Sequence, residues 1–89
     1  KRSVLVQGES VHLTPKEFGL LVYLASQPNV VFTRGDIIRD IWGRPDGGGD
    51  VRTVDTHIKR LRSKITEGRA IPWSITTVWG VGYKFQINE

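Results

Sequence analysis

Residues 52–64 read RTVDTHIKRLRSK, and this stretch decides which fold the rest of the chain has to complete. It holds five of the chain's 13 Lys and Arg residues, and Asp55 is its one acidic residue. Its formal net charge of +4 equals that of the whole chain, so the remaining residues are neutral overall. One short segment therefore carries the charge that a polyanionic partner would meet.

The same stretch has the periodicity of an amphipathic helix, which we expect over residues 51–66. With a turn of about 100° per residue, its apolar residues fall on one narrow stripe. This stripe comprises Val54, Ile58, Leu61 and Ile65. The opposite side carries cations and hydroxyl groups, namely Arg52, Thr56, Lys59, Arg60 and Ser63. Such a helix suits the major groove of DNA, although a polar face that is merely solvated has the same pattern.

The composition narrows the classes of protein to consider. A chain of 89 residues predicts a single domain over residues 1–89 with a modest core. The absence of cysteine excludes disulfides and thiolate zinc sites, and fits a reducing compartment such as the cytoplasm. No apolar run approaches the ~20 residues of a membrane span. The sequence pI of about 9.9 favours nucleic acid over anionic lipid, because the charged helix lacks a broad apolar face.

Catalytic and metal-binding patterns are missing from the sequence. The glycine run lacks the Lys-Ser/Thr that completes a phosphate-binding loop, and no nucleophile-elbow pattern occurs. His12 and His57 have no further ligands in a metal-binding spacing. We therefore predict no enzyme, no cofactor and no metal.

Before the charged helix, the chain predicts a hairpin and a first helix. Residues 3–13 alternate as two strands around a turn at Gly8. Thr14, Pro15 and Glu17 form a capping-box signature for a helix that runs to about residue 27. Its predicted buried stripe comprises Phe18, Leu21, Val22 and Ala25, with Leu24 beside it.

A second helix and a loop lead to the charged helix. Residues 30–32 form a short apolar link, and Thr33 with Asp36 caps a helix that Gly43 ends. Residues 44–50 read RPDGGGD, which predicts an irregular loop.

After the charged helix, residues 71–87 predict a second hairpin with its turn at residues 80–82. Ile75 and Val78 have opposite parity, which indicates a bulge or a twist in one strand.

The predicted order is hairpin, three helices, hairpin. This is an α+β winged helix-turn-helix, in which residues 51–66 form the recognition helix and residues 74–87 the wing. The first hairpin would be part of an N-terminal antiparallel sheet.

The chain also resembles a known family in motifs spread along nearly its whole length. These are LTPKEF (13–18), TRGDI (33–37), IWG (41–43), RTVDTHIKRLRSKI (52–65) and TVWGVGYKF (77–85). In this order and spacing they resemble the winged-helix effector domain of two-component response regulators of the OmpR/PhoB type. The resemblance implies sequence-specific binding of double-stranded DNA as the output domain of a transcriptional regulator.

The resemblance further implies partners and a longer protein. The domain would follow a receiver domain that a sensor kinase phosphorylates, and would bind direct repeats as a head-to-tail tandem dimer. The family's N-terminal sheet has four strands, so one or two would be missing here. The loop after the second helix would face RNA polymerase. Its predicted residues are Arg44, Asp46, Gly47, Gly48 and Gly49.

The sequence assigns DNA contacts to the charged helix. Thr56, Lys59 and Arg60 are predicted to contact bases, since Arg reads guanine and Thr packs on thymine. Arg52 and Thr53 lie in the first turn, where side chains and N–H groups can hold a phosphate. Arg62 and Lys64 are the remaining cations of this helix.

Two alternatives stay open for Arg62, namely a phosphate contact and a structural pair with Asp55. Lys64 is predicted to be a solvated charge. The resemblance places Trp42 at a helix end facing a phosphate, and we expect Trp42 to be partly buried.

The resemblance also places Thr77 and Tyr83 near the DNA backbone, although Tyr83 could equally pack in the sheet. Trp79 stands where many family members carry Arg, which can enter the minor groove. We expect it to pack on sugar, backbone or a neighbouring protomer.

Two alternative functions remain at this stage. The module could serve mainly in protein contact, with itself or with RNA polymerase. It could also be the DNA-binding domain of a membrane-anchored regulator.

Overall fold

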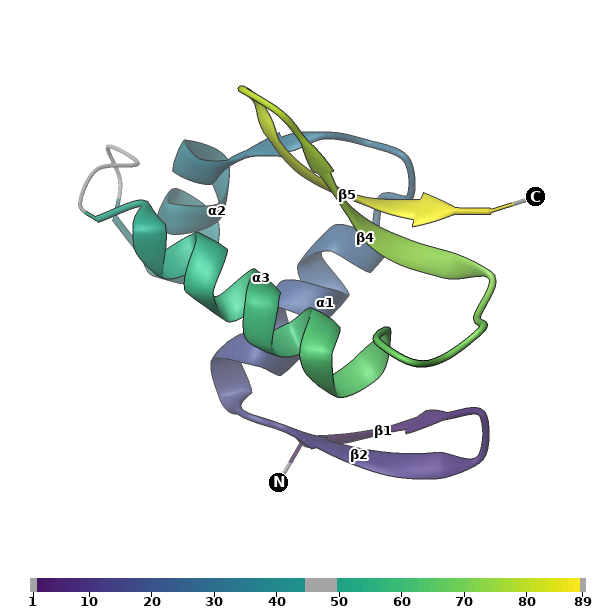
Figure 1. Cartoon of the computed structure of the whole chain (residues 1–89). Coiled ribbons are helices and arrows are strands. Elements are labelled where there is room, and N and C mark those ends of the chain that lie inside the picture. Colours follow the sequence, from purple (N-terminus) through teal and green to yellow (C-terminus); the bar gives the residue numbers. More distant parts are fainter. Residues whose placement is uncertain (1, 45–49, 89) are drawn as a thin grey trace.

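The computed structural model describes residues 2–44 and 50–88 and confirms the predicted order of elements. Figure 1 shows the helices between a hairpin at one end and a second sheet at the other. The elements are β1 (Arg2–Val6), β2 (Glu9–Leu13), α1 (Pro15–Ala25), β3 (Phe32–Thr33), α2 (Arg34–Ile41), α3 (Arg52–Ile65), β4 (Trp73–Val78) and β5 (Gly82–Ile87). Within the described ranges, no helix has both the length and the apolar character needed to cross a membrane.

The N-terminal hairpin forms as predicted. Strands β1 and β2 pair antiparallel from Arg2↔Leu13 to Val6↔Glu9. Gln7 and Gly8 have φ values of +53° and +82°, and two successive positive values suit a tight two-residue hairpin turn. Val6 and Leu13 are buried, so this hairpin covers one end of the helical core.

Both predicted capping boxes are present. The hydroxyl of Thr14 accepts from the N–H of Glu17, whose carboxylate accepts from the N–H of Thr14. Thr33 and Asp36 make the same reciprocal pair at the start of α2. Gly43, with a φ of +72°, follows the last turn of α2 as expected.

The stripe predicted for α1 is wrong. The fully buried residues are Glu17, Leu20 and Leu24, whereas Val22 is 50% exposed. Apolar residues occur on several sides of this helix, and the acid at position 17 hid the line that faces the core. The helix also ends at Ala25, two residues earlier than predicted, with Ser26 as its C-cap.

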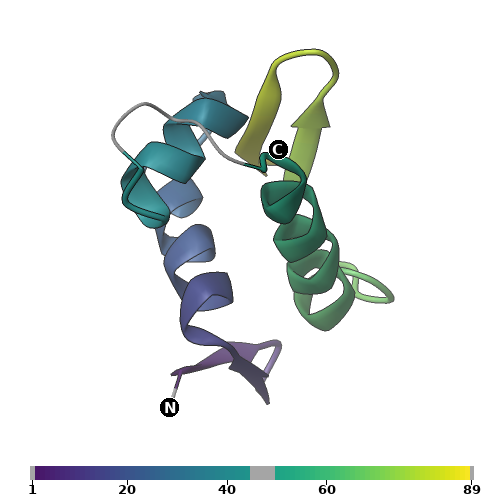
Figure 2. The ribbon, with the colours of Figure 1, turned by 90° about the vertical axis from the view of Figure 1, so that its left-hand side faces the viewer.

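Helix α3 lies along α1 and closes the core, as Figure 2 shows from the side. Its predicted stripe is confirmed, because all four of its apolar residues are fully buried. The core is completed by α1, α2 and both sheets. Its members are Val6, Leu13, Leu20, Leu24, Ile37, Ile38, Val54, Ile58, Leu61, Ile65, Ile75 and Tyr83.

The second sheet has three strands in the order β3-β5-β4, and the sequence did not predict β3. Part of the predicted apolar link pairs with β5 through Phe32↔Tyr83 and Thr33↔Gly82. A Cβ atom at Gly82 would lie 2.0 Å from the carbonyl oxygen of Phe32. Glycine is therefore required at position 82 by the close approach of two backbones.

The predicted bulge is also wrong. Strands β4 and β5 pair without interruption from Trp73↔Ile87 to Val78↔Gly82. Val78 is the last residue of β4 and is only half-buried. Its parity, opposite to that of Ile75, therefore does not require a bulge. The turn comprises residues 79–81, one position earlier than predicted, with Gly80 at a φ of +79°.

Candidate nucleic-acid interface

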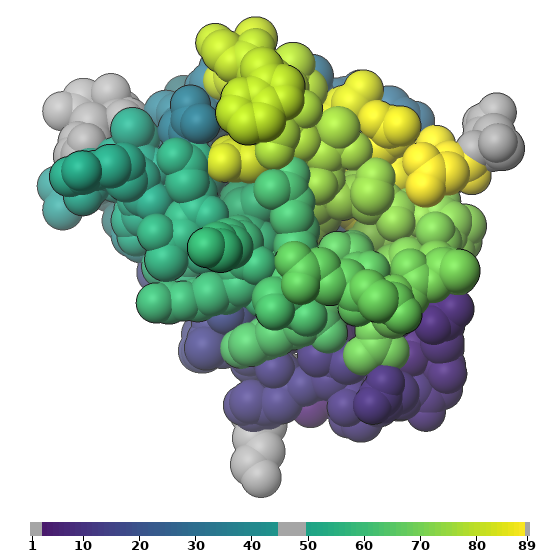
Figure 3. Space-filling view, viewed as in Figure 1, coloured from purple at the N-terminus to yellow at the C-terminus, as the bar shows by residue number. Residues whose placement is uncertain are grey.

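The outer face of α3 is open to solvent over its whole length. Figure 3 views the molecule from this side, with the tip of the β4–β5 wing above the helix. The exposed residues are those that the periodicity predicted, namely Arg52, Thr56, Lys59, Arg60 and Ser63. Because the opposite stripe is buried in the core, the orientation of this face is fixed.

The five cations of α3 fall into two groups. Arg52, Arg62 and Lys64 each bind an acceptor within the protein. Lys59 and Arg60 are exposed and form no hydrogen bond or ion pair with any other described residue. These two side chains are therefore available to an external partner.

The N-terminus of α3 is occupied by Asp50. Its carboxylate accepts from the N–H of Arg52 at 3.0 Å and pairs with the Arg52 guanidinium at 3.1 Å. These interactions hold the pKa of Asp50 below its ordinary value. Both side chains are exposed, so this pair is weak. A phosphate predicted to bind here would have to displace the Asp50 carboxylate.

Thr56 and His57 bond back into the helix. The Thr56 hydroxyl donates to the carbonyl of Arg52 at 3.2 Å, which leaves its methyl group free to face outward. Nδ1 of His57 lies 2.7 Å from the carbonyl oxygen of Thr53. His57 therefore has a structural contact within the helix.

Trp42 is half-buried, as expected, at the end of α2. Its ring meets His57 edge-on, with 5.1 Å between the centroids. The ammonium group of Lys16 lies 5.3 Å from the same ring and donates to the carbonyl of Ile41. The tryptophan is therefore held between α1 and α3.

Arg62 does not pair with Asp55, so that alternative is wrong. Its Nε donates to the carbonyl of Ile75 at 2.8 Å, and its Nη2 donates to the hydroxyl of Thr77 at 2.7 Å. Positions 55 and 62 lie about 10 Å apart along a helix, whereas β4 lies directly beside Arg62. The guanidinium consequently attaches the wing to α3.

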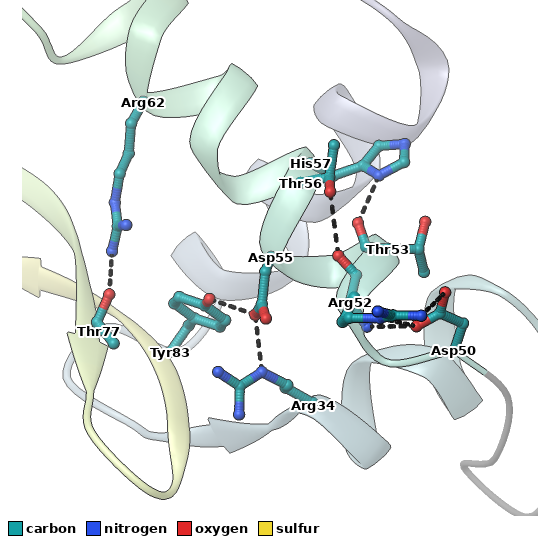
Figure 4. Close-up of polar contacts among 10 residues, drawn as sticks. All are labelled: Arg34, Asp50, Arg52, Thr53, Asp55, Thr56, His57, Arg62, Thr77 and Tyr83. Atoms are coloured by element: carbon teal, nitrogen blue, oxygen red, sulfur yellow. Dashed lines mark hydrogen bonds and ion pairs between the residues drawn. The ribbon is translucent and has the colours of Figure 1, made fainter.

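Asp55 binds two other groups, which Figure 4 shows converging on its carboxylate. Nε of Arg34 lies 2.7 Å and the hydroxyl of Tyr83 lies 2.5 Å from Oδ1. Burial raises the pKa of Asp55, but the hydrogen bonds from Tyr83 and Arg34 outweigh it and keep this pKa below its ordinary value. The carboxylate is ionised at neutral pH.

Tyr83 is only 4% exposed, which supports its packing in the sheet. Its ring lies 5.7 Å from the guanidinium of Arg34 and 5.6 Å from that of Arg62. Burial, followed by the hydrogen bond to Asp55 and the charge of Asp55, raises the pKa of its hydroxyl. The hydroxyl is therefore protonated and donates to Asp55.

The prediction that Lys64 is a solvated charge is wrong, because Lys64 pairs with an acid of α1. Its ammonium group lies 2.6 Å from the buried carboxylate of Glu17.

The predicted loop residues divide between the described and undescribed parts of the chain. Arg44 is exposed, whereas Asp46, Gly47, Gly48 and Gly49 lie outside the described residues.

Trp79 lies at the tip of the wing and is 87% exposed. Val81, two residues further along the same turn, is 47% exposed. An apolar surface of this kind at the tip of a hairpin is free to pack on a partner.

The sequence did not single out Arg34 or Asp50, and it assigned Glu17 only to the capping box of the first helix. Asp55 entered only as a partner for Arg62. The sequence did contain a signal for Asp55, because a single acid within a cationic helix indicates a specific partner for its carboxylate. The partners of Arg34 and Glu17 lie 21 and 47 residues away, so local patterns cannot find them. Among the described residues, no group of three His, Cys, Asp or Glu side chains is placed to hold a metal ion.

A cationic helix anchored in a three-helix core, with an antiparallel wing bonded to its side, is the architecture of a winged-helix DNA-binding domain. Solved structures with this architecture superpose closely on the chain. The DNA-binding domain of Bacillus subtilis CssR is 34% identical with a TM-score of 0.79, covering 94% of this chain and 90% of that one. The Klebsiella pneumoniae RstA DNA-binding domain, solved in complex with the RstA box, is 34% identical with a TM-score of 0.80, covering 96% and 83%.

The family described as "Transcriptional regulatory protein, C terminal" matches residues 8–85. The chain belongs to this family, as an OmpR/PhoB-type DNA-binding domain of a response regulator. The response regulator DrrB of Thermotoga maritima, an OmpR/PhoB homologue, is 38% identical with a TM-score of 0.80, covering 94% of this chain and 37% of DrrB.

The transcriptional regulatory protein SrrA of Staphylococcus aureus is 49% identical over 87 residues. This match covers 97% of the present chain and 36% of SrrA, so the chain corresponds to part of a longer relative. The family comprises DNA-binding transcription regulators and is not a class of enzymes.

Proposed function

We propose that this chain binds specific sequences of double-stranded DNA, with α3 in the major groove and the wing on the adjacent backbone or minor groove. The observation that carries the proposal is a pair of cations, Lys59 and Arg60, that have no partner among the described residues and lie in the middle of an exposed helix face. An unpaired Arg on such a face can bind the O6 and N7 atoms of guanine in two parallel hydrogen bonds.

The residues around this pair take supporting roles. Thr56 presents its methyl group to a thymine, because its hydroxyl is bonded within the helix. Arg52 contacts a phosphate by exchanging Asp50 for it, and Thr53 lies beside it in the same turn. Trp42, held against His57 at the end of α2, faces a neighbouring phosphate.

The wing has a different task. Thr77 and Arg62 are bonded to each other near its tip and approach the backbone together. Trp79 at the tip packs on sugar or on a second copy of the domain. Tyr83 acts through Asp55 rather than by touching DNA.

The partners of the longer protein follow from the family. We propose an upstream receiver domain, a sensor kinase that phosphorylates it, RNA polymerase as a contact of the loop after α2, and a cytoplasmic location. We also propose that copies bind direct repeats head to tail. The DNA complexes of RstA and of the AdeR DNA-binding domain, the latter with an intercistronic region, support the DNA part of this proposal.

Selection from a random duplex library at near-physiological salt tests the proposal. We expect an enriched motif, and an affinity whose logarithm falls by about 0.9 per contacted phosphate for each log unit of salt. Two copies of the motif spaced about one helical turn apart would support tandem binding. Retention of duplexes without any enriched motif would refute specific recognition, and retention independent of salt would refute phosphate contact.

A matched pair of variants sharpens the test. Arg60→Ala removes one cation that has no partner among the described residues, whereas Arg39→Ala removes one exposed cation that α2 pairs with its own acids. We expect the first variant to lose the motif and the second to keep it. Equal losses would show that only total charge matters.

A further inference from the structure

Two polar links join α3 to the wing, and each link holds a different strand. The carboxylate of Asp55 accepts from the Tyr83 hydroxyl on β5 at 2.5 Å. The guanidinium of Arg62 donates to the Thr77 hydroxyl on β4 at 2.7 Å. Figure 4 shows both links between the helix and the hairpin. The links begin about two turns apart on the helix.

The two links end on one cross-strand pair. Thr77 and Tyr83 are direct partners in the β4–β5 register. Tyr83 is also the partner of Phe32, so the third strand joins at the same place. Widely spaced points on α3 are therefore bonded to a single position of the sheet, which opposes rotation as well as translation of the wing.

The geometry of each link is reinforced. Nε of Arg62 donates to the carbonyl of Ile75, so the guanidinium holds two acceptors on β4. Nε of Arg34 donates to Asp55, which ties the second helix to the same carboxylate. Hydrogen bonds with an ionised partner are the stronger kind, and these are such bonds. Tyr83 is 4% exposed, so water competes little for its bond.

The wing tip amplifies any movement at this point. Trp79 lies two residues beyond Thr77, and the described chain offers the tip no other support, since Trp79 is 87% exposed. A small rotation at the Thr77–Tyr83 pair therefore moves the tip relative to the exposed face of α3.

We propose that Asp55 and Tyr83 are positioning residues. With Arg62 and Thr77 they form a clamp that sets where the wing lies relative to α3, and thereby how helix and wing engage the same DNA. The inference rests on the proposed function and deepens it, because it assigns alignment of the two contact surfaces to residues that need not touch DNA.

Pairs of spin labels measure the alignment directly. The chain has no cysteine, so Ser63→Cys on α3 and Val81→Cys at the wing tip can be labelled selectively. We expect a narrow distance distribution in this parent, and broader ones when Tyr83→Phe or Asp55→Asn is added. Tyr23→Phe is the matched control, because it removes a tyrosine–aspartate bond of the same length, from Tyr23 to Asp40, away from the wing.

The same proteins are then titrated with a duplex that the parent selects. We expect Tyr83→Phe to weaken specific binding about tenfold, and Tyr23→Phe to leave it unchanged. Denaturation curves establish that each variant is folded under these conditions. If Tyr83→Phe and Tyr23→Phe lose similar stability and only Tyr83→Phe loses affinity, the loss of affinity comes from the alignment of the wing and not from stability.

The outcomes separate the two proposals. If the parent binds its duplex and Tyr83→Phe leaves the distance distribution between the labels unchanged, the clamp is overturned and the proposed function is not. Broadened distances with full affinity would also overturn the clamp, since the alignment would then not serve binding. Failure of the parent to select any duplex would refute the proposed function itself.

Discussion

Lys64 in the last turn of α3 reaches the carboxylate of Glu17 in the first turn of α1, with Nζ and Oε1 2.6 Å apart. Glu17 is 1% exposed and also closes the capping box of α1 with Thr14. The pair therefore joins the end of α3 to the start of α1.

Removing this partner should destabilise the fold. Lys64→Met leaves a buried carboxylate without its counter-charge, and we expect the free energy of unfolding to fall by about 2 kcal/mol. Urea denaturation at pH 7 measures this change. Lys59→Met, on the exposed face of the same helix, is the control and should change stability little. Equal effects would show that the Glu17 pair contributes nothing special.

The same pair predicts a dependence on pH. Burial raises the pKa of Glu17, but the hydrogen bonds from Lys64 and Thr14 outweigh it and keep this pKa below 4.5. Its contribution to stability is therefore present above about pH 4.5 and is lost as the pH falls through the lower folded value. In Lys64→Met the folded pKa rises, so less stability should be lost between neutral and acidic pH than in the parent. An equal loss of unfolding free energy in the parent and the variant as the pH falls would contradict this account.

Asp50 should restrain DNA binding. It holds the N–H and the guanidinium of Arg52 at the start of α3, where a phosphate would otherwise bind. We expect Asp50→Asn to raise affinity for duplex DNA and to steepen its salt dependence by about one phosphate contact.

The control for this prediction is Glu67→Gln, which makes the same change of charge at an exposed position after α3. Fluorescence anisotropy over a salt series distinguishes the two variants. If both tighten binding equally, the effect comes from net charge and not from the position of Asp50.

Arg60 and Arg52 should differ in what they contribute. Arg60 has no partner among the described residues and is proposed to bind a base, so Arg60→Ala should weaken the selected site by about 1–3 kcal/mol. Arg52→Ala should weaken selected and random duplexes alike, because phosphates are the same in both. Competition titrations give both affinities. A uniform loss for Arg60→Ala would remove it from the base contacts.

Trp79→Arg should increase the affinity of the wing for DNA. An arginine adds the charge that a narrow minor groove attracts, and the side chain at this position is already 87% exposed. We expect tighter binding and a steeper salt dependence. Leu5→Arg supplies an equal charge on the first hairpin, at a side chain that is 76% exposed. The same gain from both substitutions would argue against a wing contact with DNA.

Two glycines should respond in opposite ways to alanine. Gly82→Ala places a methyl group against the carbonyl of Phe32, and we expect a loss of about 1–3 kcal/mol. Gly19→Ala meets no atom within 4 Å in the interior of α1, and should stabilise by about 0.5–1 kcal/mol. Thermal unfolding of both variants measures the contrast. Tolerance of alanine at position 82 would mean that β3 and β5 separate easily.

The features predicted correctly from the sequence are those that nearby residues determine. The stripe of α3 repeats over four turns with no competing apolar side, and Thr14 and Thr33 lie three residues from their capping partners. Alpha-helix periodicity failed for α1, because apolar residues such as Val22 surround it and the buried line includes Glu17.

The features that were missed depend on distant contacts. Strand β3 has only two residues, and its partner Tyr83 lies about fifty positions away. The division of the α3 cations was equally hidden, since Lys64 and Arg62 find their acceptors only when α1 and β4 pack beside them. Lys59 and Arg60 were correctly placed because nothing in the described chain reaches them.

Thr33 belongs to two structures at once, because it pairs with Gly82 as the end of β3 and caps α2 through Asp36. The next residue, Arg34, is the one that holds Asp55. A chimera that receives only the β4–β5 hairpin of a relative would therefore lack the donor residues that join this hairpin to α2 and α3. Exchange of wings between such domains has to carry residues 32–34 together with the hairpin, so that the donor's sheet arrives with the residues that seat it.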